Sequence, residues 1–206
     1  MAEELVFYTN PMSRGRIVRW MLEETGCAYR TEILGFGQDM KSPGYRAVNP
    51  MGKVPAILHN GTVVTEGAAI CAYLADAFPE AGLAPAPSNR GSYYRWMFFA
   101  AGPVEAALSN KAFGFEVPAD KQRAIGYGSI DDVISALEYA VSQSEYIAGD
   151  RFTAADVYVG SQIGWGMMFG TLEKRPAFEA YWQRIANRPA ALRAREIDDA
   201  LVPPKA

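Results

Sequence analysis

Few residues in this chain of 206 are of the types that usually do chemistry. Cys27 and Cys71 are the only cysteines and have no CxxC spacing, so we interpret both as buried apolar residues rather than a redox pair. His59 is the only histidine, and with two scattered cysteines it does not predict a metal site. A Ser-His-Asp triad would need His59, but Asn60-Gly61 after it is typical of a hairpin turn, which favours a surface histidine.

Two hydroxyl groups near the N-terminus remain as candidates. Ser13 lies at the predicted start of the first helix, where serine often caps the helix and where the helix dipole stabilises negative charge. Tyr8 lies at the end of the first predicted strand. The residue types alone leave open whether either hydroxyl has more than a structural role.

Composition narrows the class of partner. Half of the residues are hydrophobic, 21% are charged and the net charge is −3, which is typical of a globular protein with a sizeable core. We find no basic run or stripe, so nucleic acid is not an expected partner. No apolar run approaches the ~20 residues of a membrane helix, and the acidic start does not resemble a signal peptide. We therefore expect a cytoplasmic protein without a membrane partner.

Short alternating elements must position the candidate hydroxyls. Four segments have strand patterns, the last two joined by the Asn-Gly turn: 5–8, 29–34, 54–58 and 62–64. Apolar residues at helical spacing predict helices over 13–25 and 66–78, with Gly26 ending the first. Strands and helices thus alternate within about the first 80 residues.

The chain after this point is predicted to be helical. Prolines and glycines between 79 and 87 indicate a boundary, so we expect domains at 1–80 and 91–206, with a linker at 81–90. The helical patterns cover 88–113, 119–144, 153–169, 177–187 and 190–200. Gly102-Pro103 should kink or split the first of these helices. Thr153 and Asp156 predict a capping box, which we interpret as structural.

Three segments together resemble the soluble glutathione transferase family. The segment 7–16 runs from a strand through a Pro-x-Ser turn into a helix. The segment 49–58 contains the pattern N-P-x-G-x-V-P, and 65–70, which reads T-E-G-A-A-I, is close to the family's E-S-x-A-I. The cap at 152–156 matches a fourth, structural mark, and the order and spacing agree over essentially the whole chain.

The resemblance implies a fold and an assembly. The N-terminal part would be an α/β thioredoxin-like domain with the order β-α-β-α-β-β-α, and the C-terminal part an all-α helical bundle. The family branch would be a bacterial type that activates the thiol with serine. Its members are cytosolic homodimers that use glutathione as a co-substrate and act in detoxification, and no metal is implied.

The resemblance also implies a set of contacts to glutathione. Pro55 would follow a cis peptide bond, so that the backbone of Val54 pairs with the cysteinyl part of the tripeptide like an added strand. Without the family pattern, Pro55 would be an ordinary proline at the start of a strand. Lys41 and Lys53 stand where relatives contact the glycyl carboxylate and the backbone, and a solvated surface charge is the alternative for each.

The third motif departs from the family pattern at Gly67. Relatives have a serine there that helps to bind the γ-glutamyl carboxylate, and Glu66 would meet the α-amino group. The backbone N–H groups and the dipole of the following helix remain as an anion site. One hydrogen bond to a charged group is absent, worth ~1.5–3 kcal/mol in general, so a modest glutathione affinity is expected.

Ser13 fills the position of the thiol-activating serine in the resemblance. A thiol with a pKa of ~8.5 is mostly protonated at neutral pH, and a hydroxyl that donates to the thiolate favours ionisation. Tyr8 is the rival, because other family branches use a tyrosine at the end of the first strand. Arg14 or Arg16 could add positive potential, or both could face solvent. No cysteine occupies the turn, which argues against glutaredoxin-like chemistry.

The resemblance places an electrophile site between the domains. The candidates share small, aromatic or thioether side chains near the predicted kink, the first loop and the capped helix: Met12, Trp96, Phe99, Gly102, and Trp165 or Met168. The hypothesis is a homodimeric glutathione transferase that conjugates glutathione to small hydrophobic electrophiles. Glutathione-dependent isomerase, peroxidase or dehalogenase activity, or non-catalytic binding of glutathione or a partner, remain alternatives.

Overall fold

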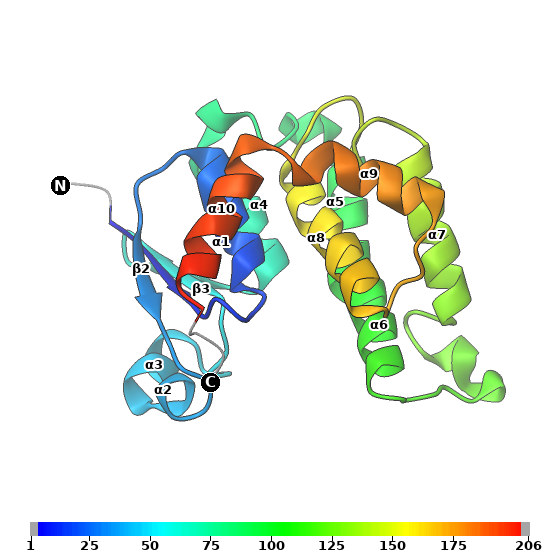
Figure 1. Cartoon of the computed structure of the whole chain (residues 1–206), viewed down its shortest axis with the longest axis horizontal. Helices are drawn as coiled ribbons and strands as arrows, with labels where there is room; N and C mark the ends of the chain where they lie inside the picture. Colours follow the sequence, from blue (N-terminus) through cyan, green and yellow to red (C-terminus); the bar gives the residue numbers. More distant parts are fainter. Residues whose placement is uncertain (1–3, 203–206) are drawn as a thin grey trace. The chain divides into compact units, whose positions relative to one another are not determined.

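The computed structural model describes residues 4–202, and the chain forms two compact units. One unit comprises Met1–Leu83 with Arg188–Ala206, and the other comprises Ala84–Asn187. The sequence predicts one helical domain over 91–206, whereas the last helix groups with the N-terminal residues. The reason is that this helix packs against the first helix of the chain (Figure 1).

A four-stranded sheet forms the centre of the first unit. Its strands are β1 (Leu5–Thr9), β2 (Arg30–Ile33), β3 (Ala56–His59) and β4 (Thr62–Thr65). The spatial order is β2-β1-β3-β4, in which β1 pairs parallel with β2 and antiparallel with β3, and β3 pairs antiparallel with β4. This topology confirms the predicted thioredoxin-like domain, including the hairpin at the Asn-Gly turn.

The helices of the first unit cover the sheet and one another. They are α1 (Gly15–Thr25), α2 (Gln38–Lys41), α3 (Pro43–Val48), α4 (Gly67–Ala77) and α10 (Pro189–Ala200), with a short 3-10 turn at Pro79–Ala81. The Arg19 guanidinium of α1 lies over the Phe7 ring, whereas the Tyr8 ring packs against Tyr45 of α3. Because successive strand residues point to opposite faces, α1 and α3 lie on opposite sides of β1.

His59 corrects one expectation. The sequence favours a surface turn, but His59 closes β3 and is only 5% exposed. Its ring stacks on Phe78 and its Nδ1 lies 3.0 Å from the Tyr73 hydroxyl. Tyr73 belongs to α4 and Phe78 follows its last residue, so these are contacts that the Asn-Gly turn does not reveal. His59 is therefore a packing residue of the first unit.

The second unit is helical. Its elements are α5 (Gly91–Phe99), a π-helical segment (Ala100–Val104), α6 (Glu105–Ala112), α7 (Ile130–Ser142), α8 (Ala154–Phe169) and α9 (Pro176–Ala186), with 3-10 turns at Pro87–Asn89 and Ala119–Ala124. Pro103 lies in the π-helical segment, as expected for a residue that cannot donate a helical hydrogen bond. None of the helices in the described range is long and apolar enough to cross a membrane.

The second predicted helix of this unit is shorter than expected. The pattern over 119–144 yields an α-helix only from Ile130, because Gly128 adopts a φ of +68° and Ser129 then caps the helix. The Ser129 hydroxyl oxygen accepts from the backbone N–H of Asp132 at 3.1 Å. A glycine in left-handed conformation followed by a good cap therefore outweighs the helical periodicity on either side.

The predicted capping box of α8 is confirmed and is a buried hub. Asp156 is fully buried, and its carboxylate accepts hydrogen bonds from Thr153 N–H at 2.9 Å, Ile147 N–H at 2.8 Å and the Tyr181 hydroxyl at 2.8 Å. Burial raises the pKa of Asp156, and the hydrogen bonds oppose that shift. One side chain thus ties the start of α8 to α9 and to the loop before α8.

We predict that Asp156→Ala destabilises the protein by roughly 3–5 kcal/mol, because it leaves several buried donors without a partner. Urea unfolding measures the change. Asp132→Ala is the matched control: Asp132 has the same position relative to its cap residue but lies at the surface, so it should cost less than ~1 kcal/mol. Equal losses in the two variants would contradict the hub.

Candidate active site

The register of three strands brings the motif segments to one edge of the sheet. Tyr8 of β1 pairs with Ala56 of β3, and Ala56 pairs with Thr65 of β4. Because β3 is antiparallel to both neighbours, the end of β1, the start of β3 and the end of β4 share this edge. Residues 10–13, 54–55 and 66–67, which lie far apart in the sequence, therefore leave the sheet together.

The first of these segments is a closed turn built on Asn10. Its side-chain oxygen accepts from Met12 N–H at 2.9 Å, and its amide nitrogen donates to the Leu34 carbonyl beyond β2 at 2.8 Å. The Asn10 carbonyl oxygen accepts from the backbone N–H of Ser13 at 3.1 Å. This Asx-type geometry fixes the direction in which the chain enters α1.

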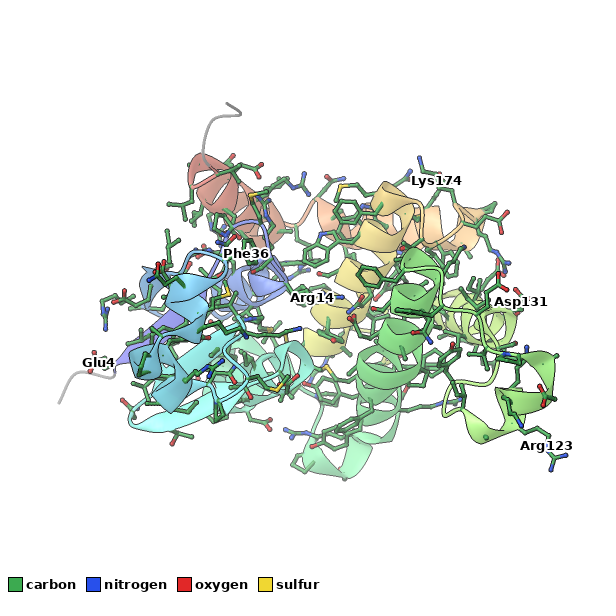
Figure 2. The ribbon with its side chains drawn as sticks, turned by 90° about the horizontal axis from the view of Figure 1, so that it is seen from below. Glu4, Arg14, Phe36, Arg123, Asp131 and Lys174 are labelled. Carbon is green, nitrogen blue, oxygen red and sulfur yellow. The ribbon has the colours of Figure 1, made fainter. Side chains whose placement is uncertain are left out.

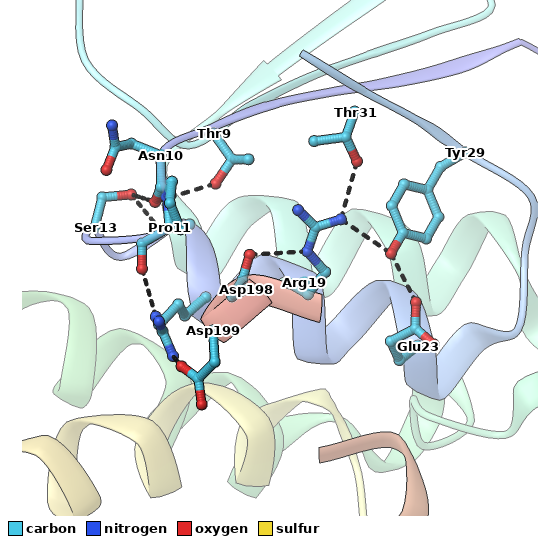
Figure 3. Close-up of polar contacts among 12 residues, drawn as sticks. Thr9, Asn10, Pro11, Ser13, Arg19, Glu23, Tyr29, Thr31, Asp198 and Asp199 are labelled. Atoms are coloured by element: carbon cyan, nitrogen blue, oxygen red, sulfur yellow. Dashed lines mark hydrogen bonds and ion pairs between the residues drawn. The ribbon is translucent and has the colours of Figure 1, made fainter. Parts of the chain in front are cut away.

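Ser13 precedes Arg14, the N-cap residue of α1, and its hydroxyl has a defined position (Figure 3). The Oγ atom accepts from Gly15 N–H at 3.0 Å, and the O–H donates to the Asn10 carbonyl at 2.7 Å. Position 15 must be glycine for its N–H to reach the Ser13 Oγ in this way, because a Cβ there would collide with the buried Thr9 hydroxyl. Ser13 is half-buried, and while its Oγ accepts from the Gly15 N–H its hydroxyl proton can rotate.

The second segment contains a cis peptide bond between Val54 and Pro55, as the resemblance implied. Lys53, which precedes Val54, is fixed by two hydrogen bonds. Its carbonyl accepts from the Tyr45 hydroxyl at 2.7 Å and from the Asn49 side chain at 2.8 Å. Burial raises the pKa of Tyr45 to about 12, so it remains a donor. Among residues 4–202, no hydrogen bond uses the backbone N–H or C=O of Val54.

Lys41 stabilises the loop in front of this segment. Its ammonium group donates to the carbonyl of Met51 at 2.9 Å and to that of Gly52 at 2.8 Å. The sequence offers a surface charge or a ligand contact for Lys41, and the structure adds a third role that sequence spacing did not reveal. Lys53 is exposed.

The third segment is the start of α4. Glu66 is exposed and adopts a φ of +68°, which is uncommon for a residue other than glycine. The helix begins at Gly67 without a side-chain cap. The first backbone N–H groups of α4 therefore have no intrahelical acceptor, and together with the helix dipole they favour negative charge at this position.

Tyr8 differs from Ser13 in its surroundings. Its ring packs against Tyr45, with the centroids 5.5 Å apart, beside a cluster formed by Met40, Tyr45 and Ala56. This is the side of β1 that faces α3, whereas Ser13 lies at the start of α1. The turn that separates them gives Ser13, and not Tyr8, a place at a helix N-terminus.

The arginines beside Ser13 also differ. Arg14 is exposed at the start of α1 (Figure 2). Arg16 does not simply face solvent, because its guanidinium donates to the Pro11 carbonyl and pairs with Asp199 of α10.

The candidate electrophile residues lie in both units. In the first unit, Met12 is 67% exposed in the turn before Ser13. In the second, Trp96 of α5 is buried and makes an edge contact with the partly buried Phe99. Gly102 is exposed in the π-helical segment with open space around the position of a Cβ, and Trp165 of α8 is partly buried. Their grouping into one pocket remains a prediction.

Comparison with known proteins identifies the family to which this chain belongs. The family model of the glutathione S-transferase N-terminal domain matches residues 12–77, and that of the C-terminal domain matches 105–189. Glutathione S-transferase GstA of Escherichia coli O157:H7 is 33% identical over an alignment that covers 76% of each chain. The chain belongs to the glutathione S-transferase family.

Other relatives of this glutathione S-transferase chain are similar over most of its length. Protein LigF of Sphingobium sp. strain SYK-6 is 46% identical, and the alignment covers 74% of this chain and 77% of LigF. The solved structure of glutathione transferase URE2P6 from Phanerochaete chrysosporium, in complex with oxidised glutathione, is 25% identical with a TM-score of 0.81. That match covers 98% of this chain and 99% of the other.

Sequence reasoning missed two parts of this candidate site. The Asn10-Pro11 dipeptide is a turn signal that could have identified the Asn10 side chain as the organiser of the Ser13 turn. No local signal identifies Arg16 with Asp199, because the two residues are separated by 183 positions. Within the described range, no group of three or more acidic, histidine or cysteine side chains could hold a metal ion.

We predict that Gly52→Ala destabilises the glutathione S-transferase unit and weakens retention on immobilised glutathione. Gly52 has a φ of +58°, and a Cβ would collide with the Met40 carbonyl and crowd Lys41, so the loop must move. Gly61→Ala is the control, because Gly61 has a φ of +83° but open space around it. It should cost only the backbone term of ~1–2 kcal/mol and leave retention unchanged. Normal retention by the folded Gly52 variant would contradict the expectation.

Proposed function

We propose that this chain is a glutathione transferase that joins the glutathione sulfur to small hydrophobic electrophiles, with Ser13 as donor to the thiolate. The observation that carries the proposal is the Ser13 hydroxyl, held at the start of α1 on the sheet edge where β3 and α4 also begin. Family membership supports it. A homodimer and a cytoplasmic location are parts of the proposal that rest on the resemblance.

The three segments at the sheet edge suit the three parts of glutathione. The backbone of Val54 offers a donor and an acceptor for the cysteinyl residue, in the manner of an added strand. The start of α4 offers backbone N–H groups for the γ-glutamyl carboxylate, and Glu66 offers a carboxylate for the amino group. Lys53 offers a positive charge, while two of the three Lys41 donors already hold loop carbonyls. Recognition thus relies mainly on the backbone.

The energy available to ionise the thiol follows from the contacts of Ser13. To donate to sulfur, its O–H must leave the Asn10 carbonyl, so a neutral hydrogen bond of ~0.5–1.5 kcal/mol is exchanged for a charged one of ~1.5–3. The net gain is about 1–1.5 kcal/mol, and the N-terminus of α1 adds ~0.3–1. Together these lower a thiol pKa of ~8.5 to about 7. The Gly15 N–H bond to Oγ is retained throughout and polarises the O–H further.

We predict that Ser13→Ala moves the acid limb of the pH profile of kcat/KM up by about one unit, because only the helix N-terminus then favours the thiolate. At pH values below this shifted limb, the thiolate fraction of glutathione and kcat/KM should be about tenfold lower than in the wild type. Steady-state conjugation of chlorodinitrobenzene measures this. Retention on immobilised glutathione should persist.

Two matched variants interpret the result. Ser129→Ala removes the serine N-cap of α7 in the second unit, a hydroxyl that also accepts from a backbone N–H at a helix start, so it should lower stability by ~1 kcal/mol without changing the pH profile. Tyr8→Phe tests the rival hydroxyl. An unchanged profile in Ser13→Ala together with loss in Tyr8→Phe would transfer the role to Tyr8.

We predict that Gly67→Ser lowers the KM for glutathione about tenfold, because it adds a hydroxyl to an uncapped anion site, and a hydrogen bond to a charged group is worth ~1.5–3 kcal/mol. Gly67→Ala is the control, since a methyl group adds no donor, and its KM should not change. A KM that stays the same in the serine variant would show that the γ-glutamyl carboxylate binds elsewhere.

Other glutathione-dependent reactions could use the same thiolate, and the uncapped start of α4 gives some support to binding without catalysis. Product analysis of conjugation, isomerisation, peroxide reduction and dehalogenation with the wild-type protein distinguishes these. Retention on glutathione without turnover in any class would support the non-catalytic alternative.

A further inference from the structure

The last turn of α10 contains two adjacent acidic residues, Asp198 and Asp199. Negative charges at a helix C-terminus oppose the helix dipole, so this position is unfavourable for α10 alone. Each carboxylate pairs with an arginine of α1: Asp198 with Arg19 at 3.1 Å, and Asp199 with Arg16 at 2.7 Å. The two arginines are three positions apart on α1 and therefore share the face that α10 covers.

The inner pair fixes α10 in place. Arg19 and Asp198 are 2% and 1% exposed, and Arg19 also donates to the Thr31 hydroxyl at 2.9 Å and the Tyr29 hydroxyl at 3.2 Å. Burial raises the pKa of Asp198, and the charge of Arg19 opposes that shift. Removal of either partner would leave a buried charge uncompensated, so α10 has one well-defined position on α1.

The outer pair reaches the Ser13 turn. The Nε of Arg16 donates to the carbonyl of Pro11, while its Nη1 pairs with Asp199 (Figure 3). Pro11 is buried and lies between Asn10, which accepts the Ser13 hydroxyl, and Ser13 itself. Because a guanidinium group is planar, one orientation of Arg16 satisfies both acceptors. The ion pair with Asp199 therefore also orients the Nε–H that donates to the Pro11 carbonyl.

We propose that Arg16 is a positioning residue for Ser13, oriented by Asp199 of the C-terminal helix. The proposal rests on the proposed role of Ser13 as donor to the thiolate. A role in stability alone is a weak explanation, because Arg16 and Asp199 are 27% and 57% exposed and ion pairs of that kind contribute little. Placement of a hydroxyl against sulfur is far more sensitive to small displacements than stability is.

The experiment compares Arg16→Lys, Arg16→Met and Asp199→Asn with the wild type in chlorodinitrobenzene conjugation. We expect kcat at low pH to fall in both Arg16 variants by no more than the roughly tenfold loss predicted for Ser13→Ala, with the KM for glutathione within about twofold of wild type. The acid limb of the kcat/KM profile should move up, since a displaced hydroxyl stabilises the thiolate less. Asp199→Asn should change in the same direction by a smaller factor. Arg16→Lys keeps the positive charge but loses the planar guanidinium group that reaches both acceptors.

Arg193→Gln is the matched control. Arg193 of α10 pairs with Glu23 of α1 at 3.2 Å, so it joins the same two helices through a partly exposed ion pair without contact to the turn. Its kcat and pH profile should equal those of the wild type, and its loss in thermal stability should resemble that of Asp199→Asn. If Arg16→Met fails to fold, Arg16→Lys and Asp199→Asn carry the test.

A double-mutant cycle with Ser13→Ala separates this proposal from the proposed function. If Arg16 acts through Ser13, Arg16→Met causes no further loss of kcat in the Ser13→Ala background. An equal loss in both backgrounds, or normal kcat and pH profile in Arg16→Lys, would overturn the positioning role while Ser13 keeps its own. Wild-type activity in Ser13→Ala would instead overturn the role of Ser13, whatever the Arg16 variants show.

Discussion

The register between β1, β3 and β4 is the constraint on which the candidate site depends. The row of Tyr8, Ala56 and Thr65 fixes where each strand reaches the edge of the sheet. A slip of one residue would turn every side chain of a strand to the other face and displace one of the three segments from the others. The register between β1 and β3 is stabilised by burial, because the neighbouring pair Phe7 and Ile57 is fully buried. Apolar packing within the sheet thus determines where polar groups meet at its rim.

The sequence predicts the parts of this unit that depend on local rules. Gly26 ends α1, the Asn-Gly turn joins β3 to β4, and Thr153 with Asp156 starts α8, because each signal acts within a few residues of the chain. The family pattern likewise anticipates the cis bond before Pro55 and the alternation of strands and helices along the N-terminal domain. The difference over 119–129 is also local, because the left-handed Gly128 and the N-cap Ser129 outweigh helical periodicity there.

What the sequence could not predict consists of contacts between distant residues. Lys41 could be identified as a cation near the site, but not as the donor to two loop carbonyls, since that depends on where α2 ends. The burial of His59 depends on Tyr73 of α4 and on Phe78 directly after that helix, and the local Asn-Gly turn does not reveal these partners. The pairs between α1 and α10 have no periodic or turn signature, and single charges on helices are common. Long-range polar contacts of this kind are specified by packing, which one sequence does not display.

The association of α10 with α1 makes the first unit discontinuous in the chain. Its sheet is complete once residue 65 has been made, yet the helix that covers α1 and pairs with Arg19 and Arg16 follows the whole helical unit in the chain. On the ribosome, the sheet and α1 are therefore made before α10. The face of α1 that α10 covers stays open while the whole helical unit is translated. The first unit, which bears Ser13, can therefore be completed only after the helical unit has been translated, and until then the nascent chain exposes the face of α1 that α10 later covers.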